Sequence, residues 1–288
     1  MSTTNSPLQK IKSAFALITI PLVMVISFIL YFTLLGNPEN FSGGTTEGHP
    51  ENYLGIVYKG GIIVPVLMSF FLMVVTFSIE RFLTIRKAYG TGSLENFLRG
   101  IKADLEEEDL EAGIKKCAVQ KGSVGNVVVA GLTKYKQALT EHGLSKDQKV
   151  LAVQKEVEEA TSLELPMLEK NLTIIATLAS IATLTGLLGT VIGMIKAFAA
   201  LATAGAPDAI ALANGISEAL INTALGIATS ALAIISYNYF TSLIDTLTYS
   251  IDEISFSITQ GFSSHYQSKS NNNFSTEEGV LLKKNLQL

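Results

Sequence analysis

The sequence predicts an all-α polytopic membrane protein with four transmembrane helices and a helical cytoplasmic domain. Of the 288 residues, 48% are hydrophobic and only 16% are charged, whereas soluble domains carry about 25% charged residues. The mean hydropathy is +0.38. Four apolar stretches are each long enough to cross the hydrocarbon of a bilayer, which takes about 20 helical residues. The excess apolar side chains therefore need lipid around them.

The first two apolar stretches carry positive charge at opposite ends. Residues 14–35 follow Lys10 and Lys12, whereas residues 61–79 are followed by a cluster of Arg and Lys. The first run is longer than the apolar core of a signal peptide, which has about 7 to 15 residues, so we expect an uncleaved helix. Lys and Arg in short flanking segments are retained in the cytoplasm. Residues 36–60 are therefore expected on the outer side.

This charge pattern orients the whole chain and places both termini in the cytoplasm. The expected order is a cytoplasmic N-terminus (1–13), an extra N-terminal transmembrane helix (14–35), a periplasmic loop (36–60), a transmembrane helix (61–79), a cytoplasmic helical domain (80–170), a transmembrane helix (171–201), a periplasmic turn (202–209), a transmembrane helix (210–240) and a cytoplasmic helix with a disordered tail (241–288). The tail is polar and low in complexity, which predicts the disorder.

The polar segments contain no motif of a known chemistry. Residues 146–170 place apolar side chains at helical spacing and predict an amphipathic helix. No glycine-rich phosphate loop, zinc-ligand spacing or Ser/His/Asp grouping occurs, so we expect no enzyme activity, no cofactor and no metal. The single cysteine, Cys117, excludes an internal disulfide. The net charge of −4 is spread over mixed acidic and basic side chains, so nucleic acid is not an expected partner.

One acidic residue, Glu218, stands in the fourth apolar stretch, which is otherwise uncharged as far as Phe240. A charge at membrane depth costs between about 2.5 and 10 kcal/mol or more, so it is normally kept where ions, protons or partners use it. We interpret Glu218 as a group that takes up and releases a proton. The alternative is a neutral carboxyl that only hydrogen-bonds a neighbouring helix. Lys196 is expected to extend to the outer surface, which leaves Glu218 without a cationic partner.

The third and fourth apolar stretches predict two closely packed helices. Small residues at three- and four-residue spacing let helix backbones approach each other, which drives association in lipid. The glycines with this spacing are Gly186, Gly189, Gly193 and Gly226. Glu218 and Asn222 lie four residues apart and share one face of the fourth helix. Counted from the outer ends, Thr190 and Glu218 lie at similar depths of about 15 Å, so we expect them to meet in an antiparallel hairpin.

Two segments resemble the hallmark helices of the MotA/TolQ/ExbB proton-channel family, and of its ExbB/TolQ branch in particular. They are GLLGTVIGMIKAF (186–198) and GISEALINTALGIATSALAIISYNYF (215–240). The resemblance implies a homopentamer in the bacterial inner membrane, whose third and fourth helices line a central pore. That pore holds the single transmembrane helices of an ExbD/TolR-like partner, which works with a TonB-like protein. The resemblance also assigns Glu218, Thr190 and Thr223 to the proton pathway, and Asn222 lies beside them.

The chain departs from the family pattern at three places. Thr183 and Leu232 stand where the family usually has prolines, so these helices should kink less. Residues 14–35 are an additional helix relative to the three-span ExbB layout. Three alternatives stay open besides an ExbB-like motor: a TolQ-like motor of envelope maintenance, a MotA-like or gliding stator, and a non-conducting membrane scaffold. The MotA branch generally lacks a glutamate at the position of Glu218.

Overall fold

The computed structural model describes residues 15–141, 143–202 and 208–285, and these residues form helices with a single isolated β-bridge, between Phe41 and Pro50. Two compact units make up the chain. Unit 1 comprises the chain up to Arg81 together with Asn171–Phe240, and unit 2 comprises Phe82–Lys170 and the chain from Thr241 onward. The expected N-terminus (1–13) and most of the expected turn (202–209) lie outside the described residues.

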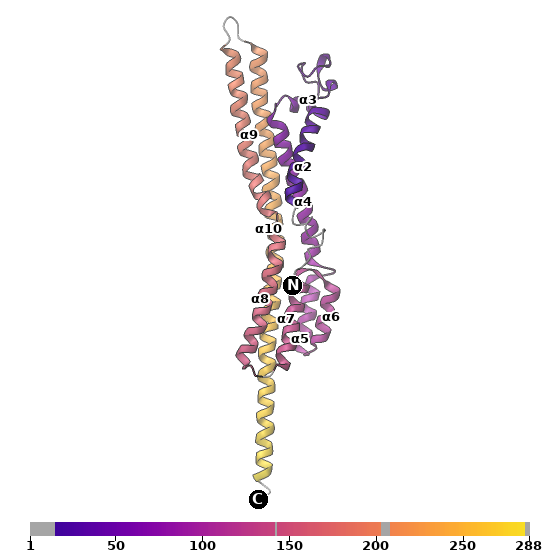
Figure 1. The fold of residues 1–288 in the computed structure, drawn as a ribbon, viewed down its shortest axis with the longest axis vertical. Coiled ribbons are helices and arrows are strands. Elements are labelled where there is room, and N and C mark those ends of the chain that lie inside the picture. The colour runs from indigo at the N-terminus through magenta and orange to yellow at the C-terminus, as the bar shows by residue number, and fades with distance from the viewer. Residues whose placement is uncertain (1–14, 142, 203–207, 286–288) are drawn as a thin grey trace, which may run out of the picture. The chain divides into compact units, whose positions relative to one another are not determined.

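Among its described residues, unit 1 contains the apolar segments of four helices that are long and apolar enough to cross a membrane (Figure 1). The helices are α2 (Phe15–Leu30) with the π-helical turn η1 (Tyr31–Leu35), α4 (Ile63–Tyr89), α9 (Leu172–Leu201) and α10 (Ala209–Asn285). The first half of α10 runs beside α9 as an antiparallel hairpin (Figure 1). Both helices continue without interruption through Thr183 and Leu232, the places where the family usually has prolines.

The segment between η1 and α4 is structured rather than a plain loop. It contains η2 (Pro38–Asn40), η3 (Ser42–Gly44) and α3 (Tyr53–Tyr58). The side-chain amide of Asn40 donates hydrogen bonds to the carbonyls of Leu34 (2.8 Å) and Leu35 (2.9 Å). Carbonyls at a helix end lack partners within the helix, so Asn40 satisfies two of them and fixes the chain direction after η1.

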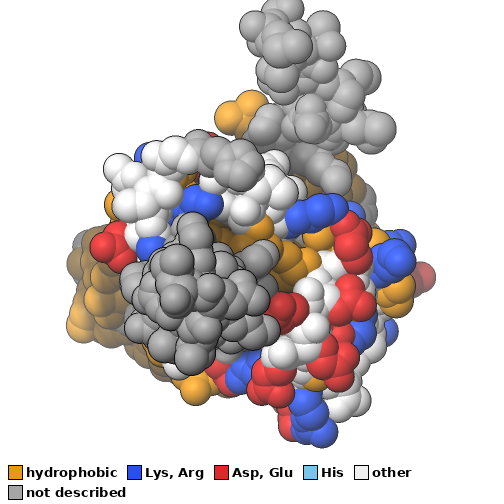
Figure 2. Space-filling model, turned by 90° about the horizontal axis from the view of Figure 1, so that it is seen from below, with side chains coloured by type: hydrophobic (Ala, Val, Ile, Leu, Met, Phe, Trp, Pro, Cys, Tyr) orange, Lys and Arg blue, Asp and Glu red, His pale blue; other side chains and the backbone are white. Residues whose placement is uncertain are grey.

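Unit 2 is a helical bundle with an apolar core. Its helices are α5 (Leu94–Glu106), α6 (Leu110–Gln120), α7 (Gly122–Thr140) and α8 (Lys146–Glu169), together with the later part of α10. The amphipathic helix expected over residues 146–170 is present as α8; it starts with a capping box formed by Ser145 and Gln148 and buries Val153 and Val157. On the face drawn in Figure 2, Lys and Arg side chains stand among Asp and Glu side chains.

The expected disordered tail differs from the structure, because α10 extends to Asn285. No proline occurs after residue 240, and the tail's only glycines are Gly261 and Gly279. Once a helix is nucleated, each added residue contributes one hydrogen bond, so elongation is easier than a new start. A polar composition without a proline is therefore compatible with the continuation of a helix that begins in the apolar segment.

Candidate functional site

The hairpin of α9 and α10 is held by backbone contact at glycines. A methyl group added at Gly186 would lie 2.9 Å from the carbonyl oxygen of Asn222 and 3.1 Å from the Cα of Gly226. One added at Gly193 would lie 2.7 Å from the amide nitrogen of Ala219. These distances are shorter than ordinary carbon contacts, so any side chain larger than hydrogen would push the helices apart. The fourth predicted packing residue, Gly189, lies against the side chain of Asn222.

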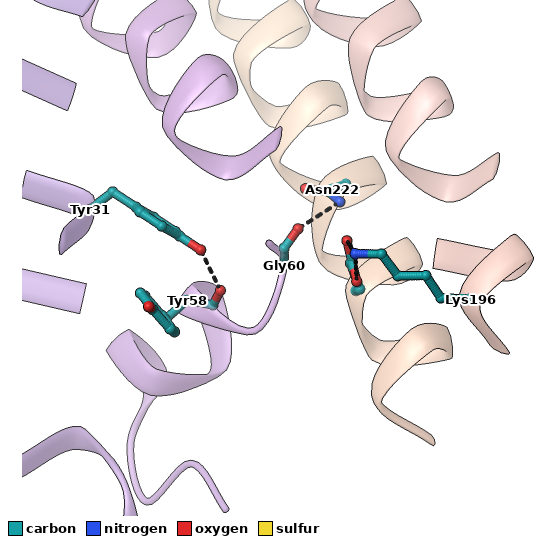
Figure 3. A network of polar contacts seen from close by, with 6 residues as sticks. Tyr31, Tyr58, Gly60, Lys196 and Asn222 are labelled. Carbon is teal, nitrogen blue, oxygen red and sulfur yellow. Dashed lines mark hydrogen bonds and ion pairs between the residues drawn. The ribbon is translucent and has the colours of Figure 1, made fainter. Parts of the chain in front are cut away.

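Glu218 is buried in unit 1 and forms an ion pair with Lys196. The ammonium nitrogen of Lys196 lies 2.6 Å from Oε1 and 2.8 Å from Oε2 of Glu218 (Figure 3). The Glu218 side chain is 9% exposed and the Lys196 side chain is 54% exposed. The expectation that Lys196 extends to the outer surface was therefore wrong.

The length of the lysine side chain explains this correction. Lys196 lies five residues before the end of α9 at Leu201, and Glu218 lies nine residues after the start of α10 at Ala209. The difference in depth is about 6 Å, because a helix rises about 1.5 Å per residue. Four methylene groups span that distance, and an unpaired buried carboxylate is costlier than an ammonium drawn inward.

On its other side, Glu218 lies against the turn that precedes α4. Gly61 has a φ of +76°, and a methyl group at its Cα would lie 2.6 Å from Oε1 of Glu218. Asn222 is fully buried and donates a hydrogen bond of 2.9 Å from Nδ2 to the carbonyl of Gly60 (Figure 3). Its Oδ1 is buried and has no hydrogen-bond partner within the described part of the chain. The turn of Gly60 and Gly61 thus covers the acid and the amide together.

The additional N-terminal helix supports this turn. The hydroxyl of Tyr31 in η1 donates a hydrogen bond of 3.0 Å to the carbonyl of Tyr58, and the two rings stack at 4.7 Å (Figure 3). Tyr31, Leu35 and Val64 form an apolar cluster, against which Ile221 of α10 also packs. The contacts join η1, the end of α3, the turn and α10, so the position of Gly61 depends on η1.

Thr190 and Thr223 pair with each other rather than with Glu218. Their hydroxyl groups form a hydrogen bond between α9 and α10, and each also bonds a carbonyl four residues earlier, that of Gly186 for Thr190 (3.3 Å) and of Ala219 for Thr223 (3.2 Å). The expected contact of Thr190 with Glu218 was wrong. Glu218 and Thr223 are five residues apart, which places them about 140° apart around the helix. The four predicted pathway residues therefore form two pairs on different sides of α10.

A cavity of about 400 Å³ lies between α9 and α10. Its lining residues are Ala176, Ala179, Ser180, Thr183, Ser230, Ile234 and Tyr237. Within the described residues, no group of three or more His, Cys, Asp or Glu side chains is placed to hold a metal ion. The charged groups that the geometry brings together at the site are the carboxylate of Glu218 and the ammonium of Lys196.

Three contributors to the site were missed by sequence reasoning: the pairing of Lys196, the Gly60–Gly61 turn and the support by Tyr31. A lysine inside an apolar run is a signal for a nearby acid, since isolated charges are rare there. Two adjacent glycines immediately before an apolar helix are a signal for a tight turn with positive φ. No sequence signal places that turn against Glu218.

Comparison with known proteins assigns the family. Residues 122–253, which include α9 and the Glu218 segment of α10, match the family described as MotA/TolQ/ExbB proton channel family. The Tol-Pal system protein TolQ of Pseudomonas aeruginosa is 33% identical over 158 residues, which cover 51% of this chain and 68% of that protein. The chain belongs to the MotA/TolQ/ExbB proton channel family. The part of the chain that the structure describes holds four helices long and apolar enough to cross a membrane, and the protein is a multi-pass membrane protein.

Relatives named for biopolymer transport are also similar. The biopolymer transport protein ExbB of Xanthomonas campestris is 32% identical over 91 residues, which cover 32% of this chain and 36% of that protein. The biopolymer transport protein ExbB of Helicobacter pylori is 44% identical over 71 residues, which cover 25% of this chain and 49% of that protein. The chain thus spans half or less of the length of these two ExbB proteins. The ExbB/TolQ branch, which the two helical segments predicted, is confirmed.

Proposed function

We propose that this protein is the proton-channel subunit of an ExbB/ExbD-like motor in a bacterial inner membrane, with both termini in the cytoplasm. The motor couples the proton-motive force to outer-membrane transport through a TonB-like protein. The observation that carries this proposal is the buried carboxylate of Glu218 within two apolar, glycine-packed helices. A carboxylate in such a place is expensive and is normally retained for ion or proton movement.

The energy available is sufficient for mechanical work. One proton that crosses 100 mV releases about 2.3 kcal/mol, and each unit of pH difference adds about 1.4 kcal/mol. In this mechanism Glu218 takes up and releases the proton. The amide of Asn222 and the hydroxyls of Thr190 and Thr223 supply polar groups along the route, because Asn222 lies one helical turn after Glu218 and the two hydroxyls bond each other between α9 and α10.

The proposed assembly is a homopentamer around a pore that holds an ExbD/TolR-like single-span protein, with lipid on the outside. Support comes from the apolar side chains that α9 exposes in the single chain. These side chains are Leu184, Leu187, Leu188, Val191, Ile195 and Phe198. Exposed apolar rows of this size need lipid or protein to cover them. A ring of copies with a central helix would cover part of the row, and lipid would cover the rest.

Replacement of Glu218 by glutamine tests the proposal, because glutamine keeps the size and hydrogen bonding of the side chain but does not titrate. The matched control is Glu95→Gln in α5, whose side chain is 82% exposed. We expect E218Q to abolish transport in cells and proton flux in proteoliposomes that contain the whole complex, whereas E95Q retains both. Normal transport by an intact E218Q complex would contradict the proposal.

Two other functions are each favoured by one observation. The relative with the broadest coverage among those above is a TolQ, which favours a motor of envelope maintenance. Deletion of the gene separates the two motors: a TonB-type motor is needed for uptake of large nutrients, and a Tol-type motor for resistance of the outer membrane to detergent. The Lys196 ion pair satisfies the acid, which favours a non-conducting scaffold. A scaffold would retain full function in E218Q.

A further inference from the structure

Lys196 contacts the buried acid, and the family comparison assigns no role to it. We propose that Lys196 is the counter-ion that keeps Glu218 charged in the resting chain, and that it must leave the carboxylate before Glu218 can take up a proton. This inference rests on the proposed function of Glu218 as the proton-carrying group. It makes Lys196 a positioning residue for proton uptake.

Lys196 and Glu218 are in direct contact. The ammonium group lies within hydrogen-bond distance of both carboxylate oxygens, at 2.6 and 2.8 Å. Lys196 is the only charged residue in α9, and Glu218 is the only one between the start of α10 and Phe240. Each is therefore the only ionic partner that these two helix segments offer the other. A close opposite charge favours the ionised form of an acid.

The other groups that enclose Glu218 are uncharged. The turn before α4 presents Gly61, which has no side chain, and the carbonyl of Gly60, which is engaged by Asn222. The hydroxyl of Tyr31 is engaged by the carbonyl of Tyr58. None of these groups supplies a positive charge. If Lys196 withdraws, the carboxylate remains buried without a counter-ion, and such a group avoids the cost of its charge by protonation.

The two partners of the ion pair differ in exposure. The Glu218 side chain is 9% exposed and fixed between a helix and a turn, whereas the Lys196 side chain is 54% exposed. Lysine carries its charge on a flexible four-carbon stem. The ammonium group of Lys196 can therefore move out of the site while the carboxylate of Glu218 stays in place. The carboxylate then accepts a proton from hydronium, giving a neutral acid and water, and Lys196 remains an ammonium ion.

Infrared absorption of the full-length protein in its complex, in lipid at pH 7, tests the proposal. The signal is the C=O stretch of a protonated carboxylic acid, and its loss in the double variant K196M/E218Q assigns it to Glu218. We expect no such band in the wild type or in Lys196→Arg, which keeps the positive charge, and a clear band in Lys196→Met and Lys196→Gln. A general loss of structure would not produce this pattern, because the arginine variant restores the charge.

Chemical labelling provides a second measurement on the same samples. A hydrophobic carbodiimide reacts with protonated carboxyl groups in membranes, so we expect Glu218 in K196M to be modified at least about tenfold faster than in the wild type or K196R, as for a tenfold change in the protonated fraction. A wild type with a protonated Glu218, or a K196M variant in which Glu218 stays ionised and slow to label, would overturn the proposal. If E218Q transports normally, the proposed function fails instead, whatever the infrared result.

Discussion

Replacement of Gly61 by alanine tests whether the turn before α4 positions the acid. Gly61 has a φ of +76°, and its added methyl group would lie 2.6 Å from Oε1 of Glu218. Ordinary contact begins near 3.4 Å, so the carboxylate must retreat by about 0.8 Å unless the turn itself moves. Because Lys196 lies on the opposite side of the acid, this retreat pushes the carboxylate toward the ammonium group. The contact is already 2.6 Å long, at the short end of the hydrogen-bond range, so the ion pair must rearrange. The backbone strain adds about 1 to 2 kcal/mol, as for any residue with a side chain at positive φ.

The matched control is Gly43→Ala. Gly43 has a φ of +80° and no atom within 4 Å of an added methyl group, so it carries the same backbone strain without the contact. We expect both variants to lose a similar amount of stability against denaturant, and only G61A to lose coupled transport. Transport by G61A at the level of G43A would refute the reasoning, because the steric contact with Glu218 would then have no consequence for function.

Three further predictions concern packing, support and burial. Gly226→Ala should destabilise the chain by about 1 to 3 kcal/mol, because its methyl group would lie 2.7 Å from a backbone carbonyl oxygen. Gly261, also in α10, is the control: a methyl group there would lie 3.9 Å from its nearest neighbour, the side chain of Leu105 in α5, so Gly261→Ala should stabilise the chain by up to about 1 kcal/mol. Equal shifts in the denaturation midpoint would contradict this. Tyr31→Phe removes the hydrogen bond to the carbonyl of Tyr58. It should lower the free energy of unfolding by about 1 kcal/mol and raise the rate of hydrogen exchange in the turn before α4. Unchanged exchange in that turn would show that η1 does not support the turn. Burial raises the pKa of the Cys117 thiol from 9.0 to about 12. The stabilising contribution of the buried thiol is therefore complete below pH 9 and is lost as the pH rises toward 12. Cys117→Ala should flatten the fall in stability between pH 9 and pH 12, and an unaltered slope would argue against burial of the thiol as the cause.

The apolar runs determine much of the fold because a helix that crosses lipid must satisfy its own backbone groups. The third run, residues 172–201, is one helix with those same ends. The glycines at Gly186, Gly193 and Gly226 could be recognised as contact points from spacing alone, since only small residues permit close backbones in lipid. Burial of Glu218 was likewise foreseeable from its place in an apolar run.

The arrangement around Glu218 could not be derived in the same way. Depth along a helix axis treats a residue as a point, whereas Lys196 carries its charge several ångströms from its Cα. Depth also ignores rotation about the axis, and that rotation separates Thr190 and Thr223 from Glu218. The contact with Gly61 depends on how a distant segment of the chain folds back, for which a single sequence offers no periodic pattern.

The division of the polar groups into two pairs has a consequence for the proposed mechanism. Glu218 and Asn222 face the Gly60–Gly61 turn, whereas Thr190 and Thr223 bond each other between α9 and α10. The acid is enclosed by an ion pair on one side and by a glycine turn on the other, and neither partner is a neutral proton donor or acceptor. A proton that travels by way of all four residues therefore needs a second arrangement of this site. Because Lys196 is the exposed and flexible member, its displacement is the smallest change that frees the carboxylate while the glycine contacts of the hairpin stay intact.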